Sequence, residues 1–375
     1  MVDARVQQAS VLMNTFARDT GLVGSQPPRR YLWTDAHAVC NWLALEHQLD
    51  DRRCLDLAVA LVAQVHDVLG RHRVDDARAG WISGLAESEG RQHPTIGGLR
   101  IGKPLPERPA EALQDERAEW DQDGQYYHYL TKWMHALFRL GCRTGDAKYL
   151  RWAMELALAA HQGFRARTGP PRLFWKMSID LTYPLVASSG HHDPLDGLIT
   201  CLVLRGKQAH PELDGVIADL KALCDGCNWL TDDPLGIGGL LFDAGRLAQL
   251  QKSLADTTLP HLLIDLLDSA ALGLGYYVRT DTQQLPATHR LAFRELGLAI
   301  GLQAFELIQA CEPDARALQA LERLRPYLSL QPSIEDFWLQ ARHRDTLSWK
   351  DHQDINGVML ATSLLARGFL AISET

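Results

Sequence analysis

Helical periodicity runs through most of the chain and constrains its fold more than any other feature. Apolar residues recur at i, i+3, i+4 and i+7, the spacing that places side chains on one face of an α-helix, as Leu55, Val59 and Val62 do. Glycine and proline residues separate the periodic segments, and no convincing alternating strand pattern is present. The pattern predicts twelve helices, at residues 2–18, 35–49, 51–71, 125–143, 146–166, 194–207, 212–226, 238–254, 259–278, 288–310, 313–326 and 352–372.

Three connections between the predicted helices are much longer than the roughly two to eight residues usual in helical proteins. They cover about residues 73–118, 167–190 and 327–350, and each precedes an even-numbered helix. Their glycine and proline content is accompanied by several tryptophans, which favours ordered, packed loops over disordered linkers. Short extended pieces are expected around residues 172–186.

Polar clusters flanked by aromatic residues stand at the starts of the even-numbered predicted helices. The two clearest occupy residues 121–128 and 191–197. Odd-numbered helices begin instead with plain charged residues, such as Asp51-Arg52-Arg53. If the even-numbered helices line the inside of a ring, their N-terminal ends converge on one rim and form a concave site.

The cluster before the helix at 125–143 combines carboxylates with hydrogen-bonding side chains. Gln125, His128 and Lys132 share one helical face, which lacks the many charges expected of a solvent-facing helix. Asp121 and Asp123 lie just before it, where a helix N-terminus favours anionic groups. One of the two is expected to cap the helix, and Asp123 is the better candidate for a functional role.

The helix at 194–207 repeats this arrangement. His192 and Asp196 are four residues apart, His191 and Asp193 lie beside them, and Pro194 fits the first helical turn. Imidazoles next to carboxylates can perform acid–base chemistry or bind a metal. Metal binding is the weaker option because the spacing indicates no third ligand, and a structural His–Asp pair is the remaining alternative.

Weaker clusters stand at the starts of three further even-numbered helices, and tryptophans lie beside several of them. A flat indole next to carboxylates suits a sugar, whose C–H face stacks while its hydroxyls form hydrogen bonds; ordinary core tryptophans are the alternative. The residues of these groups are Trp33, Asp35 and His37, then His289 and Arg290, then Trp349, His352 and Asp354, with Trp175 in the preceding long loop.

Composition and charge exclude several other classes of protein. The net charge of −8, from 38 basic and 46 acidic residues, disfavours nucleic-acid binding, which needs a basic surface. No apolar run is long enough to predict a membrane span. The odd, scattered count of seven cysteines favours reduced thiols and a cytoplasmic location. No break in composition divides the chain, so one domain covering residues 1–375 is expected.

A chain of twelve helices, with polar clusters at the starts of the even-numbered helices, resembles the six-hairpin glycosidase-like superfamily, the (α/α)6 barrels. The resemblance covers nearly the whole chain as architecture, with no motif diagnostic of one family. It implies an all-α toroid of six helical hairpins whose even-numbered helices are inner. It also implies a carbohydrate-active enzyme with its sugar site on the inner rim.

The leading hypothesis is a glycoside hydrolase in which Asp123 and Asp193 form the acid/base pair, with Asp354 as a second choice for Asp193. Hydrolysis with inversion needs two carboxyl groups about 6.5–9.5 Å apart. The substrate is expected to be a small or oligomeric saccharide, and no cofactor, metal, nucleic acid or membrane is expected to bind. The expected substrate-binding residues are Trp33, Asp35, His37, Gln125, His128, Lys132, Trp175, His191, His192, Asp196, His289, Arg290, Trp349, His352 and Asp354.

Two alternatives remain open. A sugar epimerase or isomerase on the same fold would use rim histidines for proton transfer and release no aglycone. A non-catalytic carbohydrate-binding or scaffold protein would show its carboxylates paired with arginine or lysine rather than available in a cleft. The oligomeric state is not predicted.

Overall fold

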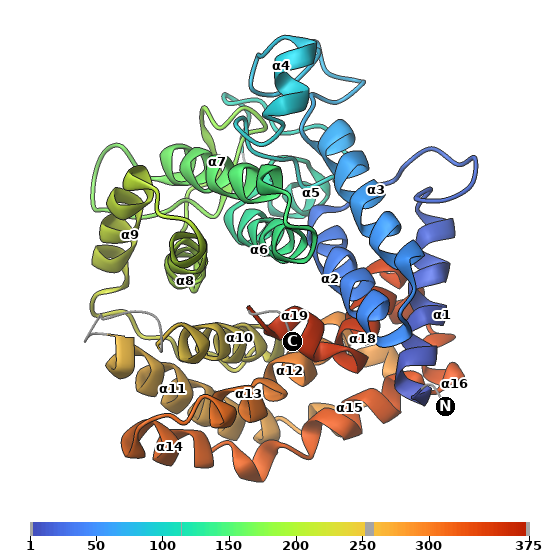
Figure 1. Ribbon diagram of the computed structural model, residues 1–375, viewed down its shortest axis with the longest axis vertical. Coiled ribbons are helices and arrows are strands. Elements are labelled where there is room, and N and C mark those ends of the chain that lie inside the picture. The colour runs from blue at the N-terminus through green and yellow to red at the C-terminus, as the bar shows by residue number, and fades with distance from the viewer. Residues whose placement is uncertain (1–2, 114, 252–258, 373–375) are drawn as a thin grey trace. The chain divides into compact units, whose positions relative to one another are not determined.

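The computed structural model describes residues 3–113, 115–251 and 259–372, and within these residues it consists mainly of helices (Figure 1). The chain divides into two compact units. The first unit comprises Met1–Phe16, Asn41–Asp51 and Asn228–Thr375, and the second comprises Ala17–Cys40 and Arg52–Cys227. Helices α1 (Ala4–Asp19) and α2 (Leu32–Leu49) contribute residues to both units. The expectation of a single domain stays a prediction.

The second unit contains helical hairpins and a small sheet. Helix α6 packs against α3, α7 and α8, and α9 packs against α7 and α8. The elements of this unit are α3 (Arg52–Leu69), α4 (Glu87–Gln92), α5 (Glu116–Asp121), β1 (Gln125–Tyr126), α6 (Tyr127–Thr144), α7 (Ala147–Phe164), β2 (Lys176–Met177), β3 (Pro184–Val186), α8 (Asp193–Lys207) and α9 (Pro211–Cys224).

In the first unit, helix α10 packs against α11, α12 and α13, while α12 also packs against α15 and α18. The elements are α10 (Pro234–Gln251), α11 (Leu259–Arg279), η1 (Thr282–Gln284), η2 (Ala287–His289), α12 (Ala292–Leu302), α13 (Ala304–Ala310), α14 (Ala315–Glu322), η3 (Arg325–Tyr327), α15 (Leu330–Leu339), α16 (Ala341–Arg344), α17 (Leu347–Lys350), α18 (Gln353–Leu364) and α19 (Ala366–Leu370). Residues 252–254 of the predicted helix at 238–254, and residue 2 of the first predicted helix, lie outside the described residues.

All twelve predicted helices occur, with two of them interrupted. The segment 288–310 divides into α12 and α13, and 352–372 divides into α18 and α19. The extended pieces expected near 172–186 are β2 and β3, which form an antiparallel sheet with β1. The predicted long connections at 73–118 and 327–350 contain short helices and the ten-residue α15. Periodicity missed the short helices because one or two turns show too few repeats, and it also missed the longer α15.

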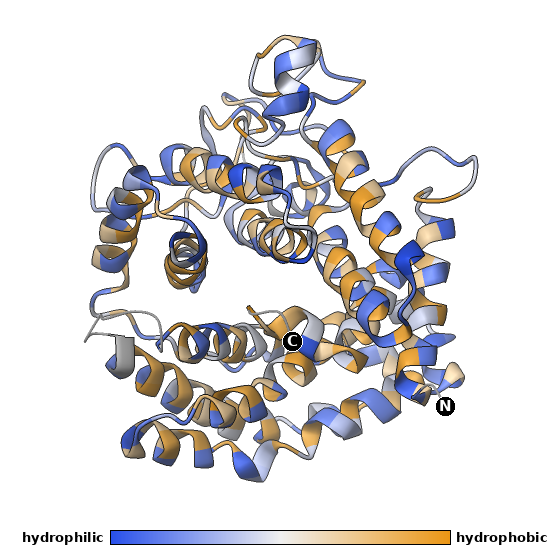
Figure 2. Cartoon of the chain, in the orientation of Figure 1, coloured by the Kyte–Doolittle hydropathy of each residue, from blue (hydrophilic) through white to orange (hydrophobic). Residues whose placement is uncertain are grey.

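Burial follows the predicted alternation of helices. In α8 the residues from Asp193 to Leu204 are all buried, and α12 is buried from Glu295 to Leu302. Helix α3, an odd-numbered predicted helix, buries one stripe and exposes the rest, and its ribbon alternates between hydrophobic and hydrophilic colours in Figure 2. A helix that is apolar all round must be surrounded by other elements, whereas a striped helix faces solvent on one side.

The hairpin of α6 and α7 is closed by local turn chemistry. Gly145 ends α6 in the left-handed conformation (φ 68°), which glycine adopts at little steric cost. Asp146 caps α7 by accepting a hydrogen bond from the backbone N–H of Lys148. At the other end, Tyr126 occupies the N-cap position of α6 and forms no side-chain cap bond. The prediction that Asp121 or Asp123 caps this helix is therefore wrong.

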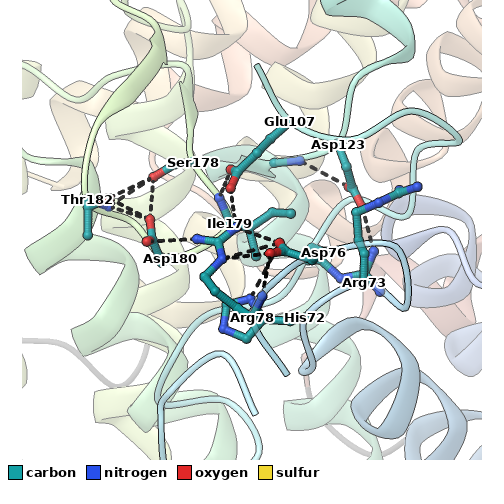
Figure 3. Close-up of polar contacts among 12 residues, drawn as sticks. His72, Arg73, Asp76, Arg78, Glu107, Asp123, Ser178, Ile179, Asp180 and Thr182 are labelled. Atoms are coloured by element: carbon teal, nitrogen blue, oxygen red, sulfur yellow. Dashed lines mark hydrogen bonds and ion pairs between the residues drawn. The ribbon is translucent and has the colours of Figure 1, made fainter. Parts of the chain in front are cut away.

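Charged side chains join the irregular segments of the second unit, as Figure 3 shows. The Arg78 guanidinium lies 2.7 Å from Asp76, 2.5 Å from Glu107 and 2.9 Å from Asp180. Glu107 also accepts a hydrogen bond from the backbone N–H of Ile179. Three loops that are distant in sequence are thereby connected, in agreement with the expectation of ordered loops.

Asp123 is fully buried and lies at the centre of a second network. Its carboxylate is 2.5 Å from Nη1 of Arg100. It is also 3.4 Å from Nη1 of Arg73 (Figure 3). It also accepts hydrogen bonds from the backbone N–H groups of Gly102 and Lys103. A buried carboxylate with this many donors has its hydrogen-bonding capacity satisfied, and it connects the loop after α3 to the start of β1.

Two buried histidines make the second unit sensitive to acid. His66 on α3 accepts a hydrogen bond from Nε1 of Trp133 on α6, and burial lowers its pKa to about 3. His37 on α2 is also buried, and burial followed by the charge of Lys132 lowers its pKa to about 3. Between pH about 6.5 and about 3 the unfolded state binds more protons than the folded state, so stability decreases as the pH falls through this window.

We expect His66→Gln to reduce this acid sensitivity. The free energy of unfolding is measured with urea at several pH values from about 7 to about 4. Its slope against pH should be smaller than in wild type by up to about 1.4 kcal/mol per pH unit, which is the contribution of one proton. His47→Gln, which changes an exposed histidine of α2, is the control and should leave the slope unchanged. An unaltered slope in His66→Gln would contradict the assignment.

We expect Asp123→Asn to destabilise the protein by about 3–5 kcal/mol, because removal of one charge leaves the Arg100 guanidinium buried without its ionic partner. Urea denaturation measures the change. Asp121→Asn alters an exposed carboxylate two residues away and should change stability by less than about 0.5 kcal/mol. A stable Asp123→Asn protein that had lost activity would support a catalytic role for Asp123 instead.

Candidate active site

An imidazole and a carboxylate meet where α6 and α8 begin. Nδ1 of His128 lies 3.5 Å from Oδ1 of Asp193, and their side chains are 27% and 7% exposed. Oδ2 of Asp193 is buried and accepts no hydrogen bond from the part of the chain that the structure describes. A buried carboxylate oxygen without a protein donor needs a ligand or an ordered water to complete its hydrogen bonding, so this pair is a candidate for a functional centre.

Aromatic rings surround His128. The ring of Trp175 is nearly parallel to the imidazole (12°, centroids 6.5 Å apart), and Tyr126 stacks at 5.4 Å. Trp33 from α2 lies edge-on at 6.0 Å. Tyr129 contacts both Trp33 and His128, and its hydroxyl group pairs with that of Tyr31 at 2.6 Å. The starts of α2 and α6 and the loop before α8 therefore contribute to one aromatic cluster.

A second charged pair links α6 and α8 one turn further along. Nζ of Lys132 lies 2.6 Å from Oδ2 of Asp196, and the Thr131 hydroxyl donates to the same oxygen. Lys132 is also 5.8 Å from the centroid of Trp33. His37 lies against Trp33 at 5.3 Å, and its lowered pKa keeps its imidazole neutral at neutral pH. Lys132 therefore places a cationic group beside Trp33 and the neutral His37.

Three of the predicted site residues are held inside the scaffold. Asp123 is fully buried in the network described above, and Asp35 binds Arg30 and the backbone N–H of Tyr31. Gln125 is also fully buried; it accepts from Leu99 N–H and donates to the carbonyls of Gly97 and Ile179. These contacts explain their conformations and present none of the three to a ligand.

The segment Asp123-Gly124-Gln125 is constrained by close packing. Gly124 has φ 146°, and a Cβ atom there would lie 2.7 Å from the carbonyl oxygen of Met177 on β2. A Cβ at Gly98 would lie 2.0 Å from Oε1 of Gln125. Both glycines allow the β1 segment to approach its neighbours, so the polar motif at 121–128 has a structural origin over its first half.

His191 and His192 precede α8 at the protein surface. Their rings lie 4.4 Å apart, with His191 exposed and His192 half-buried. His192 occupies the N-cap position, and its carbonyl accepts the N–H of Asp196. Pro194 lies in the first turn, as expected.

The remaining predicted residues all belong to the first unit. Arg290 is buried in a two-bond ion pair with Glu295, which also accepts from Nε1 of Trp338. Trp349 is buried against Trp338. These contacts are those of a packed interior. His289 and His352 are exposed, and Asp354 is half-buried.

The starts of α12 and α18 nevertheless meet, as the clusters predicted. The ring of His352 lies 5.6 Å from that of Phe293. The buried Asn356 accepts a hydrogen bond from Phe293 N–H and donates to the Trp349 carbonyl. The convergence of all five predicted clusters on one rim stays a prediction, because they belong to different units.

Three tyrosines of the aromatic cluster are not among the predicted substrate-binding residues. Tyr126, Tyr129 and Tyr31 all contact its members. Tyr126 and Tyr129 stood within the predicted helix start, and their spacing with His128 was the available signal. Tyr31 carried no signal because its partner, Tyr129, is 98 residues away.

Other features of the described residues are less suited to chemistry. Two hollows of about 410 and 370 Å³ in the first unit share Gln303, Gln331 and Arg367 and include none of the predicted site residues. Across the described ranges, no group of three or more His, Cys, Asp or Glu residues is placed to hold a metal ion. No described helix is both long enough and apolar enough to cross a membrane.

Comparisons with known proteins yield structural similarities only. No family model and no curated protein sequence matches the chain. An inactive variant of the family 76 α-1,6-mannanase from Salegentibacter sp. HEL1_6, with two adjacent aspartates replaced by alanine and α-1,6-mannotetrose bound, has a TM-score of 0.56 at 12% identity. The match covers 98% of this chain and 100% of that one.

Two further solved structures extend the comparison. The family 76 α-mannanase of Bacteroides thetaiotaomicron has a TM-score of 0.56 at 8% identity, over 98% of this chain and 96% of its own. A cellobiose 2-epimerase from Bacillus thermoamylovorans B4167 has a lower TM-score of 0.47 at 11% identity, over 86% and 87% of the two chains. The similarity to the mannanases concerns the fold alone: the chain folds as an (α/α)6 barrel.

Proposed function

We propose that this protein is a carbohydrate-active enzyme that hydrolyses glycosidic bonds, with His128 and Asp193 as its acid/base pair. The observation that carries the proposal is the meeting of these two side chains within an aromatic cluster, with one Asp193 oxygen lacking a hydrogen-bond donor among the described residues. The shared fold with glycoside hydrolases supports the reaction class.

The pair supplies an acid and a base, but its 3.5 Å separation is shorter than the about 6.5–9.5 Å that inversion requires, so the proposal does not extend to an inverting mechanism. One group must protonate the leaving glycosidic oxygen, and another must take a proton from the attacking water. Oδ2 of Asp193 has no hydrogen-bond partner among the described residues. An imidazole can donate or accept a proton and a carboxylate can accept one, so the two side chains together can supply a donor and an acceptor.

The surrounding residues suit a saccharide. Trp33 and Trp175 provide flat apolar rings beside His128, against which the C–H face of a pyranose can stack. Lys132 and Asp196 supply a charged pair next to Trp33 that can bind hydroxyl groups. The aromatic rings would fix the plane of the sugar while the polar groups fix its rotation.

Asp123 takes a different role in this proposal from the one expected from sequence. Its burial and its contacts with Arg100 and Arg73 make it a scaffold residue, so it does not supply the second catalytic carboxylate. The salt-bridged arrangement is the one expected of a structural carboxylate. Asp193 remains the catalytic aspartate, and His128 moves from substrate binding to catalysis.

Sugar epimerisation is the second candidate function, favoured by the imidazole itself. His128 beside Asp193 can remove a proton from a sugar carbon and return it, without activating water. Hydrolysis and epimerisation differ in their products. Incubation with α-1,6-manno-oligosaccharides, aryl glycosides and free sugars, each followed by NMR, distinguishes the two reactions. Hydrolysis yields a new reducing end or a free aglycone, whereas epimerisation yields an epimerised sugar.

We expect Asp193→Asn and His128→Ala each to reduce kcat/KM by about 10²–10⁴-fold on the substrate found in that panel, because each removes one half of the proton-transfer pair. Both variants should retain the wild-type circular dichroism spectrum and a cooperative unfolding transition. Steady-state kinetics provides the measurement.

Matched controls use exposed residues of the same types. Asp121→Asn and His47→Ala should retain activity within about twofold, because both side chains are exposed and lie outside the aromatic cluster. Wild-type activity in Asp193→Asn would remove that residue from the mechanism. Absence of turnover on every substrate in the panel, with saccharide binding retained, would favour the non-catalytic alternative.

A further inference from the structure

Trp120 at the end of α5 is exposed, unlike the other tryptophans of the described residues. Its side chain is 56% exposed, whereas the remaining nine are buried or half-buried. An exposed indole on a soluble protein places a large apolar ring in water, which is more typical of a binding surface than of a folded core.

The position of Trp120 is fixed by buried charges on either side of it. Lys176, next to Trp175, is fully buried, and its Nζ donates to the carbonyl and carboxylate of Glu119 and to the carbonyl of Gln122. Arg108 also contacts the Glu119 carboxylate, at 3.4 Å. The short helix α5 is thereby held to strand β2 at residues next to both tryptophans, which fixes the backbone from which the exposed ring projects.

The ring of Trp120 continues the aromatic cluster outward. It lies edge-on to Trp175 with centroids 6.1 Å apart, and Trp175 stacks over His128 at 6.5 Å. Each of these two centroid distances is comparable with the width of one pyranose ring. The rings of Trp120 and Trp175 therefore lead from an exposed surface to the His128–Asp193 pair.

We propose that Trp120 forms an outer sugar-binding subsite, and that the substrate is an oligosaccharide rather than a monosaccharide or a short glycoside. This inference rests on the proposed function of the His128–Asp193 site. Trp175 contacts the sugar nearest the reacting bond, and Trp120 stacks against a unit further along the chain. Trp120 is a specificity-determining residue and takes no part in proton transfer.

The experiment compares short and long ligands in wild type, Trp120→Ala and Trp120→Phe. The probes are the disaccharide and tetrasaccharide of the α-1,6-mannose, β-1,4-glucose and β-1,4-uronic acid series. Binding is measured by isothermal titration calorimetry, and turnover is measured where it occurs. Tyr276→Ala, which removes a 40% exposed aromatic ring in the first unit, is the matched control.

We expect wild type to bind at least one tetrasaccharide more tightly than its disaccharide. Trp120→Ala should weaken tetrasaccharide binding by roughly tenfold and leave disaccharide binding and turnover unchanged. Trp120→Phe should retain part of the affinity for the tetrasaccharide that Trp120→Ala loses, and Tyr276→Ala should leave binding of both ligands unchanged.

The subsite would be overturned if Trp120→Ala lost affinity equally for the disaccharide and the tetrasaccharide, or lost none. It would also be overturned if wild type showed no preference for a tetrasaccharide. Because binding is measured separately from turnover, loss of the proposed catalytic function alone leaves this test intact. A concentration-dependent oligomer that disappears in Trp120→Ala would assign the ring to self-association and would also overturn the proposal.

Discussion

Buried ion pairs hold the irregular segments of this protein in place, and the candidate site depends on them. Asp123 with Arg100, Glu119 with Lys176 and Asp196 with Lys132 each join segments distant in sequence. Loops carry more polar backbone than they can satisfy internally, so long loops in a compact protein need such partners. Breaking one pair is costly because it leaves the other charge buried, and the pairs therefore restrict the loops to a single arrangement.

That restriction determines which side chains are available for chemistry. Carboxylates that bind arginine or lysine are already satisfied, whereas the Asp193 carboxylate lies 3.5 Å from the imidazole of His128 and keeps one oxygen without a donor among the described residues. The same buried charges position the rings around this pair, since Lys176 fixes strand β2, which begins directly after Trp175. Structural and catalytic roles are thus divided between carboxylates that look alike in sequence.

Much of the fold could be predicted because helical periodicity is a local property. The segments that became α6, α7 and α8 were identified within a few residues of their bounds, and glycine and proline marked their ends. The short helices α4, α5 and α16 could not be predicted, because one or two turns contain too few apolar repeats to distinguish a helix from a loop. The site was predicted in part: His128 and Asp193 were both selected, but from separate clusters and without the contact between them.

The sequence by itself determined the all-helical class, the alternation of buried and half-buried helices, and the enrichment of polar and aromatic residues at alternate helix starts. These follow from spacing along the chain and from the short-range chemistry of helix ends. Only the tertiary structure decided that Asp123 pairs with Arg100 while Asp193 faces His128, and that Trp120 is exposed. Whether a carboxylate is neutralised or available depends on the groups that packing places around it, and those groups lie far away in sequence.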